Sequence, residues 1–134
     1  LGKAAATKMC RSVMIKGLEA LLTESLLAAR HYGVEAEVLA SLNDLLPMPD
    51  WDSHAQYMIS RSVQHGTRRA EEMREVASTV SETGLTPFMS LATVERQQWA
   101  EQFADVLTGV DEAGDNINTL LNRINQRAGI TSHR

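Results

Sequence analysis

The sequence predicts an all-α fold: a single domain over residues 1–134, with five or six helices built around one long N-terminal helix. Aromatic residues make up only 4% of the chain, so Leu, Ala, Val, Ile and Met must build the core, a mix that favours helices. No segment alternates apolar and polar side chains with β-branched enrichment, as a half-buried strand would. The chain also opens on a long Ala- and Leu-rich stretch that contains no proline.

That first stretch predicts a helix from Gly2 to Tyr32, with Gly33 as its C-terminal stop. Apolar residues lie almost all the way round it, which is typical of a helix that runs through the middle of a domain and is buried on most sides. A short helix is expected from Glu35 to Leu45. The prolines of the segment 47–50 then favour a turn.

The third helix is expected from Trp51 to Thr83, with Asp50 or Asp52 as its N-cap, a bend near Gly66 and an end at Gly84. Pro87 is suited to the first turn of a fourth helix, expected from Thr86 to Phe103.

The segment from Leu107 to Gly114 is expected to be looser. Asp115 is then suited to cap a last helix that ends at Gly129, before a frayed tail over 131–134. In this helix the apolar residues repeat at positions i, i+3, i+4 and i+7, which predicts a core-facing stripe of Ile117, Leu120, Leu121 and Ile124.

Composition excludes several classes of function. A net charge of −4 argues against a nucleic-acid surface, and no apolar run approaches the roughly 20 residues that span a bilayer. A single cysteine rules out an internal disulfide, and the four histidines lack ligand spacing, so we expect no metal site and a cytoplasmic, reducing location. The chain lacks an initiator Met and starts within a predicted helix, which indicates a piece of a longer protein.

Polar side chains form a narrow stripe along the first helix. Ser12 and Glu19 share a face with Lys8, Arg11 lies beside them, and Thr23 continues the line. A buried stripe of this kind needs a partner: another helix, water in a cleft, or a ligand. The alternative is that the stripe is the solvent face of a surface helix.

The segment Gly2-Lys3-Ala4-Ala5-Ala6-Thr7-Lys8-Met9-Cys10-Arg11-Ser12 resembles the opening of the C-terminal domain of β-hydroxyacid dehydrogenases, such as 3-hydroxyisobutyrate dehydrogenase. Gly2 and Lys8 match the family's glycine and lysine, whereas Arg11 and Ser12 replace an asparagine pair. The resemblance implies that Lys8 donates and accepts the proton of the reacting hydroxyl, with Arg11 and Ser12 binding the substrate. A lysine amine does this when desolvation brings its pKa toward the working pH.

A second segment, His65-Gly66-Thr67-Arg68-Arg69-Ala70-Glu71-Glu72-Met73, followed by Gly84-Leu85-Thr86-Pro87, is similar to a 6-phosphogluconate-dehydrogenase-like subgroup whose C-terminal domain is of unknown function. The resemblance implies that Arg68 or Arg69 binds an anionic substrate. It implies that His65 and Glu72 contact these arginines and not the substrate itself. The alternative is a solvated charged face with an internal Arg68–Glu72 ion pair.

The resemblance implies the 6-phosphogluconate dehydrogenase C-terminal fold and an NAD(P)-dependent oxidoreductase acting on the CH–OH group of a small anionic hydroxy acid. NAD or NADP would be held mainly by a Rossmann domain expected before Leu1, since no Gly-x-Gly-x-x-Gly motif is present. It also implies a homodimer. Two alternatives remain: a non-catalytic helical dimerisation or interaction module, and a lyase or imine reductase on the same scaffold.

Overall fold

The structure, a computed structural model, describes residues 1–108 and 116–130. These residues form α1 (Lys3–Tyr32), α2 (Glu35–Leu45), α3 (Trp51–Glu82), α4 (Phe88–Ala100), a 3₁₀ helix η1 (Glu101–Leu107) and α5 (Asn116–Ala128), and none of them forms a strand. The predicted all-α class and the long N-terminal helix are confirmed. No described helix has both the length and the apolar character needed to cross a bilayer.

Two helix boundaries follow from local residues: the predicted end of α1 at Gly33, and the start of α3 at Asp50, one of the two predicted caps. Gly33 ends α1 with φ of 71°, a left-handed conformation that side chains disfavour and glycine adopts readily. Asp50 begins α3, because its carboxylate accepts a hydrogen bond of 3.1 Å from the backbone N–H of Ser53. The predicted cap at Asp115 lies outside the described residues, as do most of the looser segment and the tail.

The predicted bend in α3 is present at His65, whose φ of −127° and ψ of 20° are not helical. A physical cause lies in the next residue. A Cβ atom added at Gly66 would lie 2.0 Å from the carbonyl oxygen of Gln97, so the backbones of α3 and α4 touch where they cross. Only a residue without a side chain permits this approach.

The fourth helix differs from the prediction of one α-helix from Thr86 to Phe103. It begins at Phe88, with Pro87 as its N-cap rather than in its first turn. α4 ends at Ala100, and the chain continues as the tighter η1, in which Phe103 has φ of −104° and ψ of 19°. Phe103 and Val106 are thereby buried in the core. Helix propensity does not distinguish these two windings, so packing decides between them.

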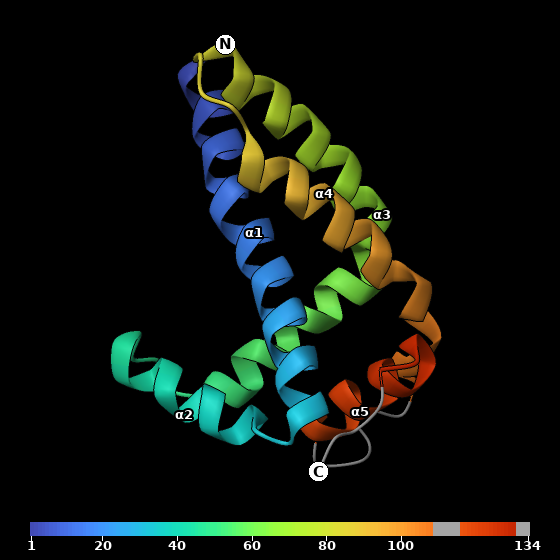
Figure 1. The fold of residues 1–134 in the computed structure, drawn as a ribbon. Coiled ribbons are helices and arrows are strands. Elements are labelled where there is room, and N and C mark those ends of the chain that lie inside the picture. Colours follow the sequence, from blue (N-terminus) through green and yellow to red (C-terminus); the bar gives the residue numbers. More distant parts are fainter. Residues whose placement is uncertain (109–115, 131–134) are drawn as a thin grey trace.

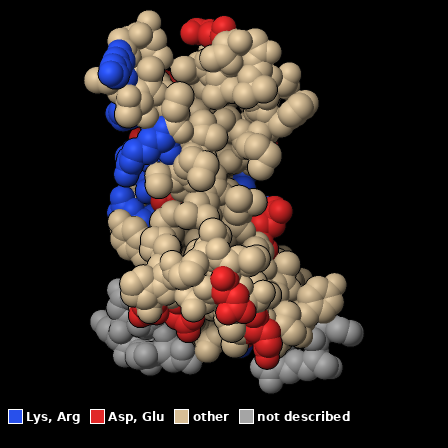
Figure 2. Space-filling model, turned by 90° about the vertical axis from the view of Figure 1, so that its left-hand side faces the viewer, with Lys and Arg blue, Asp and Glu red and all other residues tan. Residues whose placement is uncertain are grey.

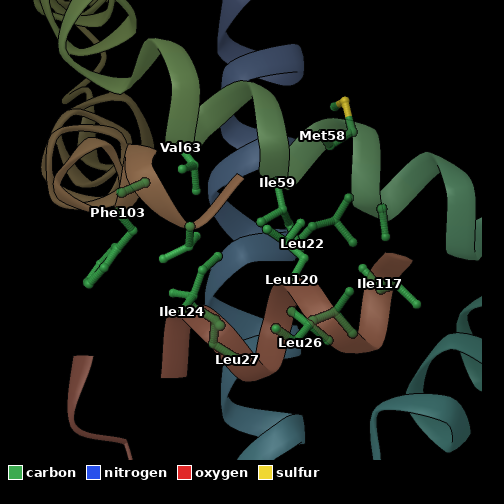
Figure 3. Close-up of a cluster of buried hydrophobic side chains, with 14 of the residues drawn as sticks. Leu22, Leu26, Leu27, Met58, Ile59, Val63, Phe103, Ile117, Leu120 and Ile124 are labelled. Atoms are coloured by element: carbon green, nitrogen blue, oxygen red, sulfur yellow. The ribbon is translucent and has the colours of Figure 1, made fainter. Parts of the chain in front are cut away.

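The helices form two levels (Figure 1). In the lower level, the C-terminal half of α1 and the first half of α3 pack with α2 and α5 around the larger apolar cluster (Figure 3). The predicted stripe of α5 belongs to this cluster. In the upper level, the N-terminal half of α1 packs with the second half of α3 and with α4 around a smaller cluster, which contains Ala70, Met73, Val76 and Val94.

The expectation that α1 is buried on most sides is wrong for this chain. α3 and α4 cover only part of its circumference, and Met14 and Leu21, which line a groove beside α4, are 72% and 55% exposed. In Figure 1 the upper half of α1 lies at the edge of the molecule. An apolar circumference alone does not say which sides neighbouring helices cover.

Candidate functional site

A buried polar layer separates the two apolar clusters and joins three helices. The carboxylate of Glu19 on α1 accepts two hydrogen bonds from the guanidinium of Arg69 on α3, at 2.7 and 3.0 Å. It also accepts one from the side-chain amide of Gln97 on α4 at 3.0 Å, and the same amide donates to the carbonyl oxygen of Lys16. The layer therefore fixes how the three helices sit along one another.

The Glu19–Arg69 pair is almost fully withdrawn from water, since the two residues are 1% and 6% exposed. The free-energy cost of desolvating such a pair is offset only when the geometry is good and further hydrogen bonds are made. The two-pronged contact and the amide of Gln97 supply both. The guanidinium of Arg69 is thus engaged inside the core by Glu19, whereas the resemblance implies that Arg69 or Arg68 binds an anionic substrate.

The polar stripe of α1 faces helices along most of its length. Ser12, Glu19 and Thr23 are buried, and the Thr23 hydroxyl donates to the carbonyl oxygen of Glu19. The solvent-face alternative is therefore wrong from Ser12 onward. Of the partners considered for a buried stripe, helices α3 and α4 satisfy Glu19.

The N-terminal end of the stripe is different, because Lys8 and Arg11 are exposed. The sequence reasoning expected a lysine partly shielded from water, and residues of this chain do not provide that shielding. Neither side chain has a carboxylate within ion-pair distance among the described residues. Their catalytic and substrate-binding roles stay predictions.

The α3 residues divide between surface and core. Arg68 is exposed and forms the predicted i, i+4 ion pair with Glu72, at 3.2 Å. Within the arginine pair, Arg68 therefore faces outward and Arg69 inward. His65 is half-buried at the kink.

One charged residue that the sequence reasoning did not select lies beside the polar layer. Lys16 is half-buried, and burial lowers its pKa. The charge of Arg69 lowers the pKa further, Glu72 and Glu19 oppose this effect, and Arg11 adds to it. These groups therefore lie close together where α1 meets α3. Gln97 was missed as well, because nothing in its local sequence distinguishes it from a surface amide.

Positive side chains gather on the face that α1 presents. Figure 2 shows Lys and Arg side chains one below another along one edge of this face, while most Asp and Glu side chains lie along the other edge and toward the lower end. In the described part of the chain, no group of three or more His, Cys, Asp or Glu is placed to bind a metal ion. The edge of this face that carries Lys and Arg therefore favours contact with anions.

The environment of His65 predicts a pH-dependent stability. Burial lowers the pKa of His65, the cations Arg61, Arg68 and Arg69 lower it further, and Glu101 opposes them. The unfolded chain therefore binds the proton more tightly than the folded one, so stability falls as the pH drops below about 6.5. We expect urea midpoints of the wild type to fall more between pH 7 and pH 5 than those of His65→Gln. An equal fall in both would contradict this assignment.

The fold defines an all-α domain whose charged face lies on its first helix, and the comparisons place it in a family. A profile described as "Domain of unknown function (DUF1932)" matches residues 29–100, more than half of the chain. The chain belongs to this family.

One solved structure is similar over most of the chain: a conserved hypothetical protein from Sinorhizobium meliloti 1021, with 39% sequence identity and a TM-score of 0.77. The match covers 91% of this chain and 42% of that protein, so the chain spans less than half the length of its relative. No curated protein matches the sequence.

Proposed function

We propose that this chain is the C-terminal catalytic and dimerisation domain of an NAD(P)-dependent oxidoreductase of the β-hydroxyacid dehydrogenase and 6-phosphogluconate dehydrogenase-like superfamily. Its reaction is oxidation of the CH–OH group of a small hydroxy acid or related compound, in the cytoplasm. The observation that carries the proposal is the amine of Lys8, exposed on α1 with Arg11 one turn away and with no carboxylate of the described residues within ion-pair distance.

Two further findings support the proposal. The DUF1932 domain is known to follow NAD-binding dehydrogenase domains. The Sinorhizobium relative is more than twice as long as this chain, which leaves room for such a domain. The described residues contain no strand followed by a glycine-rich loop and a helix, so they offer no dinucleotide site of the Rossmann type, and we assign the cofactor to an upstream domain.

In this proposal the residues of the chain handle the substrate and its proton. A bound nicotinamide supplies the hydride acceptor. Lys8 takes the hydroxyl proton as the carbonyl forms, and returns it in the reverse reaction. An upstream domain packed over the N-terminal half of α1 would remove the water that now surrounds this amine.

In this proposal the exposed cations bind the substrate. Arg11 is suited to grip a carboxylate through two parallel hydrogen bonds, with Ser12 one position further along α1. The pair of Arg68 with Glu72 is exposed and therefore weak, so Arg68 can exchange Glu72 for an anionic substrate. Arg69 acts indirectly in this scheme, because its contact with Glu19 holds α1 against α3.

A second candidate function, a non-catalytic dimerisation module, is favoured by an apolar groove of about 320 Å³ between α1 and α4. Its lining includes Met14, Leu21 and Met89, which are 72%, 55% and 62% exposed. We expect a second copy of the chain to cover this groove in either case. The oxidoreductase requires the amine of Lys8, whereas the dimerisation module does not.

The test is to replace Lys8 by Ala in the protein that includes its upstream region, and to measure hydride transfer with NAD and NADP over a panel of hydroxy acids. We expect kcat to fall by about 10²- to 10⁴-fold, because proton transfer by a positioned group contributes this much. Lys3→Ala is the matched control, being an exposed lysine on the same helix. Unchanged turnover in Lys8→Ala would refute the catalytic role and favour the dimerisation module.

A further inference from the structure

The second half of α3 and the whole of α4 form a helical hairpin over residues 66–100, the upper hairpin (Figure 1). Irregular backbone bounds it at both ends, because His65 is not helical and the chain beyond Ala100 winds as η1. Its two helices are joined across their contact, where Arg74 donates a hydrogen bond of 2.7 Å to the side-chain oxygen of Gln98. The upper hairpin is therefore one body with a break in helical winding at each end.

Polar contacts fasten the upper hairpin to α1 only near its base. In the part of the chain that the structure describes, its hydrogen bonds and ion pairs with α1 all end on Lys16, Glu19 or Glu24. They come from three residues near the two ends of the hairpin: Arg69, Arg96 and Gln97. Described residues nearer the tip, the turn between α3 and α4, make none with α1.

The apolar contact between the rest of the hairpin and α1 is small. The four buried residues of the upper cluster all belong to the hairpin, and α1 adds only Met9 and Val13, which are partly buried. The lower cluster holds sixteen buried residues from all six elements. The groove of about 320 Å³ also runs along the seam between α1 and α4, so packing does not close this seam. Separating the tip from α1 therefore exposes little apolar surface.

We propose that the upper hairpin opens away from the N-terminal half of α1 as one body, pivoting at its base, while the lower level stays folded. The Glu19 layer holds the pivot, since a buried ion pair is costly to break. The breaks at His65 and Ala100 let the hairpin turn without unwinding the first half of α3 or η1. Local opening of a protein follows such contiguous units, which have few buried apolar contacts with their surroundings.

The opening gives the hairpin the role of a gate. Its residue Val80, close to the tip, packs in the same cluster as Met9, the neighbour of Lys8 in the chain. The hairpin therefore forms one wall of the cleft that an upstream domain over α1 would create. Opening admits a small substrate to that cleft, and closing narrows it. The gating role rests on the proposed function, whereas the motion does not.

Spin-label distances measured by electron paramagnetic resonance test the motion, because the chain has a single cysteine, exposed on α1. A label on Cys10 and another on Ser81→Cys, an exposed position near the tip, span the seam. A control pair in a Cys10→Ser background joins two exposed positions of the lower level, Ser25→Cys and Tyr57→Cys. For the 134-residue chain we expect two distances for the seam pair and one for the control pair. A single narrow distance for both pairs would overturn the proposal.

Two matched variants test whether the upper cluster alone holds the hairpin closed. Met73→Ala and Met58→Ala remove the same buried side chain, one from the upper cluster and one from the lower. We expect Met73→Ala to raise the ratio of open to closed seam distances about 10-fold or more. Met58→Ala should lower the urea midpoint without changing that ratio. Val94→Ala, a smaller deletion in the upper cluster, replaces Met73→Ala if that variant does not fold. Equal ratios in the upper- and lower-cluster variants would contradict a separately opening hairpin.

The gating role is tested in the protein that includes its upstream region. With NAD or NADP and the hydroxy acid that it turns over fastest, we expect the seam pair to shift to the shorter distance. Met73→Ala should raise KM in proportion to its loss of the closed form, and Met58→Ala should leave KM unchanged. If the open fraction rose while KM did not, the gate would be refuted and the motion would stand. Hydride transfer by the wild type and by Lys8→Ala decides the proposed function separately.

Discussion

Gly66→Ala is expected to destabilise the fold by about 3 kcal/mol, at the upper end of what overpacking costs. In an ordinary helix the same change adds stability, because alanine restricts the unfolded chain. Here the new methyl group would lie 2.0 Å from the carbonyl oxygen of Gln97, a backbone atom that cannot move away without shifting α4. Urea denaturation followed by circular dichroism measures the effect.

Gly17→Ala is the matched control, since Gly17 also lies within a helix that packs against α4. A Cβ atom at Gly17 would lie 3.8 Å from the Thr93 hydroxyl oxygen, an ordinary contact. We expect the free energy of unfolding of this variant to equal that of the wild type or to exceed it by up to about 1 kcal/mol. If Gly66→Ala were as stable as Gly17→Ala, the close crossing of α3 and α4 would not exist in solution.

Replacing Glu19 by Ala is expected to cost about 3–5 kcal/mol, because it leaves the guanidinium of Arg69 buried without its counter-charge. Gln97 also loses one of its two acceptors. Small domains have a free energy of unfolding of only about 5–15 kcal/mol. We therefore expect the unfolding transition of this variant to become much less cooperative.

Two further variants make the prediction specific to the buried pair. In the double variant Glu19→Leu with Arg69→Met, no charge is left unpaired, and we expect most of the stability to return. Glu24→Ala breaks the exposed pair with Arg96 and should cost less than about 1 kcal/mol. Equal losses in Glu19→Ala and Glu24→Ala would show that water reaches the Glu19–Arg69 layer.

Parts of the candidate site were predictable because they depend on spacing along one helix. The Arg68–Glu72 pair follows from i, i+4 spacing, and the shared face of Lys8, Ser12 and Glu19 follows from helical periodicity. The inward position of Arg69 was not predictable, since adjacent residues differ by about 100° around the helix and the choice depends on where α1 lies. Lys16 was missed for the same reason.

The sequence by itself determined the all-α class, the helix end at Gly33, a cap at Asp50 or Asp52, and the buried stripe of α5, because capping and periodicity act over a few neighbouring residues. Only the tertiary structure decided which side of α1 is covered, that Glu19 meets Arg69 and Gln97, and that Gly66 lies under α4. Those pairs are 50, 78 and 31 or more residues apart in the chain. Contacts at such separations depend on the relative placement of whole helices, which local patterns do not encode.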